Sequence, residues 1–371
     1  MNSDSTLSDI QRSNENFIVY IIMFFIVFIL IFIISYIYYI RNLKSSECSS
    51  MDNLYPSIDG YITPINTSDP DCSGCLYDYY VKTAYNACSG GDYTNDFVDV
   101  CNLKSVLKQG VRALDFEIFS IDNEPVVATS TSDSFYIKQT FNSVKFSDVM
   151  STIKDYGFSN GTAPNYSDPI IIHLRCMSSN QDMFNNLAGI FAEYNSILLG
   201  SQYSFESQGN NLGKVPLTEL MNKCVIIFDK SNTAFIDNEE LTEYINMLSG
   251  SVFMRTYNYT DVANNQDVNE LTEFNKRGMT IVFPDNKSNP SNPSGILCME
   301  YGCQMVAMRY QQVDNYLEQN TLFFDRSQYA FALKPQRLRY VPVVIKDPTP
   351  QKKGYSYATR KIGTDYYNFN Y

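Results

Sequence analysis

The sequence predicts an α/β protein: a domain the size of a TIM-type (β/α)8 barrel, preceded by one transmembrane helix. Two observations carry this prediction. From about residue 76 to 340, short apolar runs alternate with segments of helical spacing, as repeated βα units require. Ahead of them, Phe17–Ile40 is a run of 24 residues without a charge, Pro or Gly. On alternation alone, a doubly wound parallel sheet fits as well as a barrel.

The apolar run Phe17–Ile40 predicts a helix that crosses a membrane. At about 1.5 Å per residue it spans the ~30 Å hydrocarbon core of a bilayer. It is too long for the apolar region of a signal peptide and lacks the basic segment that precedes one. Arg41 and Lys44 follow the run and only Arg12 precedes it closely, so the positive-inside rule favours a cytoplasmic domain.

Asn-x-Ser/Thr sequons favour the opposite orientation, since N-glycans mark secreted or lumenal chains. A chain this rich in Asn, Ser and Thr contains several by chance, so they receive little weight. They begin at Asn66, Asn160, Asn165, Asn258 and Asn286.

Composition divides the rest of the chain into segments. Residues 1–16 are polar and predicted to be disordered, and residues 41–75 form a Ser-, Asp- and Pro-rich stalk. The predicted barrel occupies 76–340. Residues 341–371 form a basic, Tyr-rich tail, for which a solvated, disordered state is favoured over contact with lipid headgroups.

Within the barrel, apolar runs and helical spacing place the elements in order. Strands are predicted at Val111–Phe119, Ile170–Leu174, Val225–Phe228, Met279–Phe283, Gln304–Tyr310 and Tyr329–Leu333. Helices are predicted at Phe146–Tyr156, Gln181–Leu199 and Asn238–Leu248.

Composition also limits the partners. The formal net charge of −12 argues against binding to a nucleic-acid backbone, and 44% hydrophobic residues support a large core. The nine cysteines are an odd number. Cys72 and Cys75, with Cys88 and Cys101, fit two disulfides, a zinc site or free thiols, and the absence of a nearby His disfavours zinc.

One predicted strand carries two acids. Asp115 and Glu117 lie two residues apart in Gly110–Phe119, so both side chains point to one face. Acids are rare in such apolar strands unless they are paired or bind a ligand. At the carboxyl end of a barrel strand, two carboxylates form a candidate hard-cation site. The alternative is a buried ion pair with Arg112 or another cation.

These segments resemble eukaryotic phosphoinositide-specific phospholipase C. Gly302-Cys-Gln-Met-Val-Ala307 followed by Leu333-Lys-Pro335 resembles the end of that family's Y half. Gly110–Phe119 resembles the strand of its X half that supplies two calcium ligands. The resemblance implies a (β/α)8 barrel of the phospholipase C-like phosphodiesterase type, with an X-like half at about 76–230 and a Y-like half at about 251–340.

The resemblance also implies a calcium site. Asp115 and Glu117 stand at two ligand positions, with the two acids exchanged, and Asn86 matches the calcium-binding Asn. Arg175 replaces the third acidic ligand, and its fixed positive charge would repel calcium. These positions are therefore vestigial, and we expect no cofactor unless the protein is active, in which case calcium is the candidate.

The catalytic positions implied by the resemblance are altered. Tyr85 and Thr129 replace the two catalytic His of the family, and neither titrates near neutral pH without strong tuning. Lys230 keeps one phosphate-binding Lys, and Phe283 keeps an aromatic ring at the substrate pocket. His173, the single His, is predicted to be a hydrogen-bonded core residue below the mouth of the barrel.

Three functions follow as hypotheses. The first is a membrane-anchored, catalytically inactive barrel that binds a protein partner or a phosphorylated headgroup such as that of a phosphoinositide. The second is a divergent phosphoric diester hydrolase that acts on a phospholipid headgroup through Asp115, Glu117 and Arg175, with Tyr85 as a further candidate. The third is a structural component of a membrane or viral envelope.

Overall fold

The structure is a computed structural model of the whole chain. It describes the backbone of residues 3–131, 137–206, 211–342, 349, 355 and 359–370, and side chains from residue 17 onward. The chain divides into two units, Met1–Arg339 and Tyr340–Tyr371, which are described separately.

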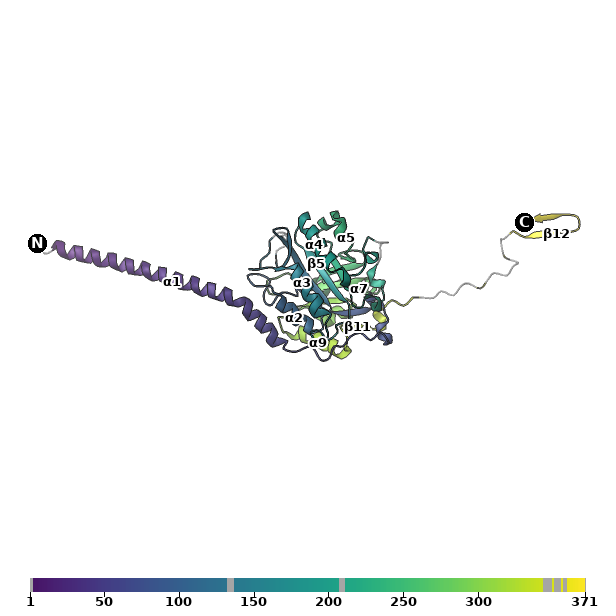
Figure 1. Cartoon of the computed structure of the whole chain (residues 1–371), viewed down its shortest axis with the longest axis horizontal. Coiled ribbons are helices and arrows are strands. Elements are labelled where there is room, and N and C mark those ends of the chain that lie inside the picture. The colour runs from purple at the N-terminus through teal and green to yellow at the C-terminus, as the bar shows by residue number, and fades with distance from the viewer. Residues whose placement is uncertain are drawn as a thin grey trace. The chain divides into compact units, whose positions relative to one another are not determined.

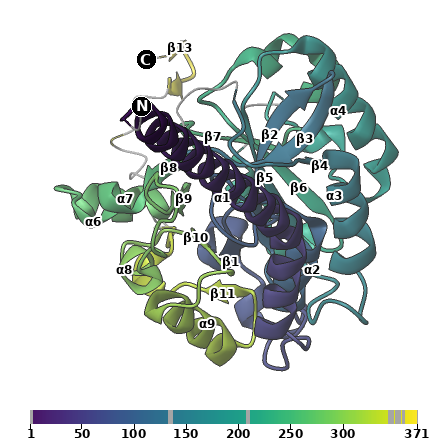
Figure 2. The ribbon, with the colours of Figure 1, turned by 90° about the vertical axis from the view of Figure 1, so that its left-hand side faces the viewer.

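Eight parallel strands form a nearly closed (β/α)8 barrel, as predicted (Figure 1). In chain order they are β1 (Tyr79–Ala84), β2 (Ala113–Ile121), β5 (Ile170–Cys176), β6 (Cys224–Asp229), β7 (Met247–Ser249), β8 (Met254–Asn258), β9 (Met279–Phe283) and β10 (Met305–Met308). Hydrogen-bonded neighbours follow the order β7-β6-β5-β2-β1-β10-β9-β8. Figure 2 shows these strands around a common axis, with the helices outside.

Helices and short antiparallel strands surround this barrel. The helices are α2 (Val100–Lys108), α3 (Phe146–Thr152), α4 (Gln181–Glu193), α5 (Glu239–Thr242), α6 (Tyr259–Ala263), α7 (Val268–Asn275), α8 (Gly295–Glu300) and α9 (Asn315–Ser327). The strands β3 (Glu124–Ala128) and β4 (Val144–Lys145) extend β2, and β11 (Phe331–Leu333) pairs with β1.

Each barrel strand contributes to two apolar cores, because successive side chains point to opposite faces. Ile171 of β5 belongs to the core inside the barrel, whereas Ile172 and Leu174 pack outward beneath the helices. Both faces of β5 are therefore covered, which explains its almost continuous apolar sequence. The helix α4 buries Phe184, Leu187 and Phe191 along one stripe against the outer core.

Two predicted elements differ from the structure, and three strands of the barrel were not predicted. The helix predicted at Asn238–Leu248 is only α5, followed by a turn and the strand β7. The strands β1, β7 and β8 were not predicted. The strand predicted at Tyr329–Leu333 exists as β11, but it runs antiparallel to β1 and lies outside the parallel barrel.

The motif around Gln304 closes the barrel between β9, β10 and β1. The buried Gln304 amide donates to the carbonyls of Tyr77 (3.0 Å), Asn275 (3.1 Å) and Gly278 (2.8 Å). Its Oε1 accepts from the backbone N–H of Thr280 at 2.8 Å. One side chain thus satisfies four backbone groups where chain segments distant in sequence meet. The motif serves barrel closure and not chemistry.

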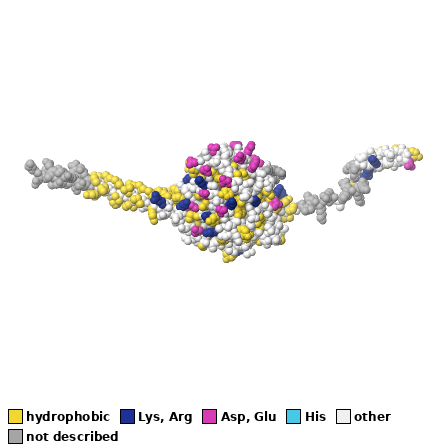
Figure 3. Space-filling model, in the orientation of Figure 1, with side chains coloured by type: hydrophobic (Ala, Val, Ile, Leu, Met, Phe, Trp, Pro, Cys, Tyr) yellow, Lys and Arg dark blue, Asp and Glu magenta, His cyan; other side chains and the backbone are white. Residues whose placement is uncertain are grey.

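The N-terminal helix α1 runs without interruption from Ser3 to Leu54. Among the described residues, α1 is the one helix that is long and apolar enough to cross a membrane. Figure 3 shows its apolar surface. It starts within residues 1–16, which were predicted to be disordered. It also includes residues 41–54 of the predicted stalk, and Met51 is buried against the barrel. This part of the stalk prediction is wrong.

The last turns of α1 lie along α2 in parallel. Lys44 Nζ pairs with Asp99 at the start of α2 (2.6 Å), and Asp52 pairs with Lys108 at its end (3.2 Å). Because α2 follows β1, it runs back from the carboxyl end of the strands. The apolar part of α1, only one turn before Lys44, therefore leaves the barrel at the carboxyl end of its strands.

Cys101 pairs with a cysteine that the sequence did not point to. A disulfide joins it to Cys48 of α1, whereas Cys72, Cys75 and Cys88 are free. Of the three alternatives, free thiols are therefore confirmed for Cys72, Cys75 and Cys88, and Cys101 pairs outside this group because Cys48 lies in the helix that packs on α2.

The second unit contains a short hairpin, β12 (Lys361–Gly363) paired with β13 (Asn368–Asn370). The tail residues Lys346, Lys352 and Lys353 lie outside the described residues.

Candidate functional site

Polar side chains meet at the carboxyl ends of β1, β2 and β5. The strand register places Asp115 beside His173 and Glu117 beside Arg175, so all four side chains point into the barrel. Asn86 follows β1 in the left-handed conformation (φ 44°), which Asn tolerates better than most residues. Its side chain reaches Glu117, to which Nδ2 donates at 3.2 Å.

Arg175 holds this group together. Its Nε donates to Asp115 Oδ1 (3.0 Å) and its Nη2 to Asp115 Oδ2 (2.6 Å), a bidentate pair. Nη1 donates to Glu117 Oε1 (2.8 Å), and Nη2 also donates to Asn86 Oδ1 (3.1 Å). The guanidinium therefore bonds to all three side chains that the family resemblance matches to calcium ligands. Such charge-assisted pairs are both strong and geometrically specific.

Burial and charge act in opposite directions on the two carboxyls. Burial alone would raise the pKa of Asp115, but the Arg175 guanidinium and the bond to His173 lower this pKa to about 2. Burial raises the pKa of Glu117, and its single bond from Arg175 offsets this only in part. Although burial lowers the pKa of Arg175, the adjacent carboxylates raise it well above its ordinary value, so Arg175 is a permanent cation.

The residues present do not fit calcium. Calcium takes six to eight oxygen ligands, but the oxygens here already accept hydrogen bonds. Both oxygens of Asp115 accept from Arg175, and Glu117 Oε2 accepts from the backbone N–H of Ser130 at 2.8 Å. The guanidinium lies among the oxygens where a metal ion would sit, and its charge repels a second cation. The group is an internal ion-pair cluster.

Of the two positions matched to catalytic His, Tyr85 lines the cavity and Thr129 does not. Burial raises the pKa of Tyr85 to about 12, and its ring packs 5.5 Å from that of Phe283. The Arg175 guanidinium lies over the Tyr85 ring, 4.9 Å from its centre. Thr129 is buried and its hydroxyl donates to the carbonyl of Tyr93 (2.9 Å), so it does not line the pocket.

His173 is buried one layer below this cluster, where the sequence places it. Its Nδ1 lies 2.8 Å from Asp115 Oδ1, and its Nε2 lies 2.8 Å from Ser249 Oγ. Ser249 Oγ in turn donates to Asp229 Oδ2 at 3.1 Å. A continuous hydrogen-bonded chain thus leads from Asp115 through the barrel interior to Asp229.

A cavity of about 740 Å³ opens above the cluster. It brings together five residues singled out from the sequence: Tyr85, Glu117, Arg175, Lys230 and Phe283. The other lining residues are Ser130, Met177, Asp229, Ser231, Gly250, Thr256, Asn258, Pro284 and Asn286.

Sequence reasoning missed Asp229 and Ser249. Asp229 directly precedes Lys230 at the end of a predicted strand, so its position at the rim was available from the pattern. Ser249 ends β7, which was predicted as helix, and nothing in the local pattern indicates its contact with His173.

Comparisons with known proteins agree with this architecture. Residues 72–231 match the family model for the X domain of phosphatidylinositol-specific phospholipase C, and residues 221–337 match the model for its Y domain. A comparison with curated proteins finds no match.

Solved structures with similar folds include two cephalopod proteins. PLC21 from L. pealei has a TM-score of 0.58 and 19% identity, over 72% of this chain and 38% of that chain. PLC21 from S. officinalis has a TM-score of 0.57 and 19% identity, with the same coverage of 72% and 38%. This chain thus covers less than half the length of these relatives, and the likeness establishes the fold. With both domain models matched in order across residues 72–337, the chain belongs to the phosphatidylinositol-specific phospholipase C family.

Proposed function

We propose that this protein is a membrane-anchored member of the family that binds a phosphorylated lipid headgroup without hydrolysing it. The observation that carries the proposal is the position of the Arg175 guanidinium. It bonds to Asn86, Asp115 and Glu117, so the site has its positive charge covalently built in.

The lack of an acid–base pair supports a non-hydrolytic role. Cleavage of the headgroup diester requires one group to take a proton and another to donate one, each worth ~10²–10⁴ in rate. The pKa of Tyr85, raised to about 12, keeps its hydroxyl protonated at neutral pH. Thr129 points its hydroxyl at a backbone carbonyl outside the pocket.

Lys230 supports binding of a phosphate. Lys230 is exposed at the rim of the cavity, and it forms no ion pair with a carboxylate among the described residues. The positive charge of Arg175 is already neutralised by its ion pairs with Asp115 (2.6 Å) and Glu117 (2.8 Å). The ammonium group of Lys230 is therefore the cation available to an anionic ligand, which it would bind as a point charge.

The direction of α1 supports a lipid as the source of that phosphate. The cavity and the apolar part of α1 are both at the carboxyl end of the barrel strands. Lys44, which contacts the start of α2, is four residues from the end of the apolar run at Ile40, a rise of about 6 Å. The cavity then faces the membrane in which α1 is anchored.

The test uses the full chain in lipid nanodiscs. We expect no release of inositol phosphates from phosphatidylinositol or its 4,5-bisphosphate, with calcium or with EDTA. We expect calcium-independent binding of inositol 1,4,5-trisphosphate by calorimetry, weakened about tenfold or more by Lys230→Met, since a charge-assisted hydrogen bond contributes about 1.5–3 kcal/mol.

Lys214→Met is the matched control. Lys214 is equally exposed but lies at the opposite end of the barrel, where Gly213 packs beside Tyr77, just before β1. Lys214→Met should bind inositol 1,4,5-trisphosphate as tightly as the wild type does. Turnover abolished by Asp115→Asn, or binding unaffected by Lys230→Met, would contradict the proposal.

The second candidate is a divergent phosphoric diester hydrolase. The chain His173–Ser249–Asp229 favours it, because Asp229 lines the cavity. The Ser249 hydroxyl has one proton but forms hydrogen bonds to both His173 and Asp229. It can donate in only one of these bonds, so His173 or Asp229 supplies the proton of the other bond. Calcium-independent turnover that disappears in Asp229→Asn and in Ser249→Ala would establish this candidate in place of the first.

A further inference from the structure

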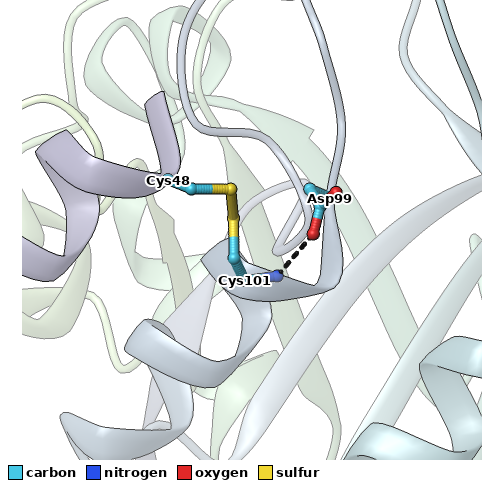
Figure 4. A group of neighbouring side chains, drawn as sticks. All are labelled: Cys48, Asp99 and Cys101. Atoms are coloured by element: carbon cyan, nitrogen blue, oxygen red, sulfur yellow. Dashed lines mark hydrogen bonds between the residues drawn. A yellow bond between two sulfur atoms is a disulfide. The ribbon is translucent and has the colours of Figure 1, made fainter. Parts of the chain in front are cut away.

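The junction between α1 and the barrel is interlocked by three different contacts. Cys48 of α1 forms a disulfide with Cys101 in the first turn of α2 (Figure 4). Asp99 caps α2, with Oδ1 accepting from the backbone N–H of Cys101 at 2.9 Å. Its Oδ2 pairs with Lys44 Nζ at 2.6 Å. The ion pair and the disulfide both join α1 to α2, and Asp99 links the ion pair to the cap of α2.

The disulfide carries information about the compartment. Its formation removes two protons and two electrons from the thiols of Cys48 and Cys101, and a disulfide oxidant such as an oxidised dithiol oxidoreductase accepts the electrons. Structural disulfides of this kind persist in secretory and extracellular compartments, whereas the cytosol keeps thiols reduced. The free cysteines fit an oxidising compartment as well, because all except Cys75 are buried: Cys72, Cys88, Cys176, Cys224, Cys298 and Cys303.

The structure also weakens the argument for a cytoplasmic barrel. Arg41 and Lys44 after the apolar run, against Arg12 before it, favour a cytoplasmic barrel by the positive-inside rule. Lys44 forms an ion pair with Asp99 that belongs to the folded domain, so its presence is explained without reference to membrane orientation. One basic residue then remains close to each end of the run, and the charge asymmetry disappears.

The fold sorts the five sequons into three groups. Asn165 is fully buried and its side chain bonds to Arg112 and Gly110, so a glycan there is incompatible with the fold. Asn258 and Asn286 line the cavity, where a glycan would cover the opening.

Asn66 and Asn160 are different from the other three. Both side chains are exposed. Each lies in a loop at the amino end of the strands, away from the cavity: the neighbour Ile65 bonds to Asp168 just before β5, and Asn160 lies between α3 and β5. A bulky, solvated glycan requires such an exposed position.

We propose that the barrel lies on the oxidising side of the membrane that α1 crosses, and that Asn66 and Asn160 are its N-glycosylation sites. The barrel is then held to the membrane helix by a covalent bond between Cys48 and Cys101. This inference does not depend on the proposed headgroup binding, but any lipid ligand would have to come from the leaflet on that side.

The test uses the full chain expressed in a glycosylating eukaryotic cell. Digestion with a glycosidase that removes N-glycans should increase the electrophoretic mobility of the protein. Asn66→Gln and Asn160→Gln should each remove one glycan step, and the double variant should remove both. A lysate incubated in the same way without the glycosidase gives the baseline mobility. Asn286→Gln is the matched control and should leave the glycan pattern unchanged.

A second readout measures the side and the disulfide. In sealed vesicles with the cytosolic face outward, added protease should leave the barrel intact, and a thiol-reactive polyethylene glycol should modify Cys48 and Cys101 only after reduction and unfolding. After detergent opens the vesicles, Cys48→Ala should expose one new reactive thiol, that of Cys101, without reduction. A barrel digested in sealed vesicles, with both thiols reactive, would overturn the proposal. A protected barrel without glycans would overturn the two site assignments.

Discussion

At the scale of single residues, Arg175 distinguishes this site from a calcium site. A metal ion neutralises carboxylates only while it is bound, whereas the guanidinium is attached to β5 and always charged. It also satisfies oxygens of Asn86, Asp115 and Glu117 directly, so none of them needs a metal. The cluster is consequently stable but leaves no coordination site.

Replacing this charge by an acid should create a calcium response. In Arg175→Glu, a third carboxylate joins Asp115 and Glu117, so calcium should raise the melting temperature relative to EDTA. The wild type should show no such shift. The comparison variant is Arg175→Met, which removes the charge without adding a ligand. Arg175→Met should lose about 3–5 kcal/mol of stability, because breaking a buried ion pair leaves the charges of the carboxylates uncompensated. Equal calcium shifts in wild type and Arg175→Glu would contradict this account.

The lowered pKa of Asp115 predicts acid sensitivity in a defined range. Its folded-state pKa of about 2 is below the ~3.9 of an unfolded Asp, so the ionised form stabilises the fold above pH 4. This contribution, on the order of 2–3 kcal/mol, is lost as the pH falls from about 4 to about 2. Asp115→Asn should flatten the stability profile in that range, measured by urea unfolding. The exposed Asp122→Asn should keep the wild-type slope, and an unchanged slope in Asp115→Asn would refute the assignment.

At the scale of elements, neighbouring segments decide which local pattern prevails. Leu241, Ile245 and Leu248 have helical spacing and all reach the outer core, yet they do so from α5, a turn and β7. The strand β1 was missed because Lys82 interrupts its apolar pattern. In the fold, the buried Lys82 pairs with Asp59 at 3.3 Å, a partner from the segment after α1.

The closure by Gln304 should be among the most sensitive positions of the barrel. Gln304→Leu keeps a similar volume but leaves three carbonyls and one N–H without this partner. Since each unsatisfied buried group costs about 1–3 kcal/mol, we expect a loss of more than about 3 kcal/mol in urea unfolding. Gln319→Leu, the same change at an exposed position of α9, should stay within about 0.5 kcal/mol. Equal effects of the two substitutions would show that Gln304 does not close the barrel.

At the scale of the whole first unit, the N-terminal apolar helix and the barrel belong to one compact unit. The α1–α2 contact links the apolar run to the end of the barrel that holds the cavity. The apolar run is therefore joined to the barrel by a packed, disulfide-linked part of the same helix and not by an extended stalk.

Removing the disulfide should reveal how much it contributes. Cys48 and Cys101 are 53 residues apart, for which loop-closure entropy predicts about 4 kcal/mol of stabilisation. Cys48→Ala, Cys101→Ala and the double variant should all lower the melting temperature of the full chain in detergent by a similar amount, because each breaks the same bond. Strictly additive losses would show that the two thiols are not joined.

Residue patterns alone were sufficient for the apolar helix and the two acids on one strand face, whereas the choice of a (β/α)8 barrel over a doubly wound sheet came from the resemblance to phospholipase C. Each of these features is indicated by local periodicity or by a sequence motif. The site itself could be predicted only in part, since the chain pattern places Asp115 and Glu117 together but is silent on their partner.

The partners depended on tertiary contacts. Arg175 meets Asp115 because β2 and β5 pair in one register, and Ser249 meets His173 because β7 completes the wall of the barrel. Cys48 meets Cys101 because α1 continues past its apolar run onto α2. Such contacts join residues tens of positions apart, and their geometry follows from how strands and helices pack, which no local pattern encodes.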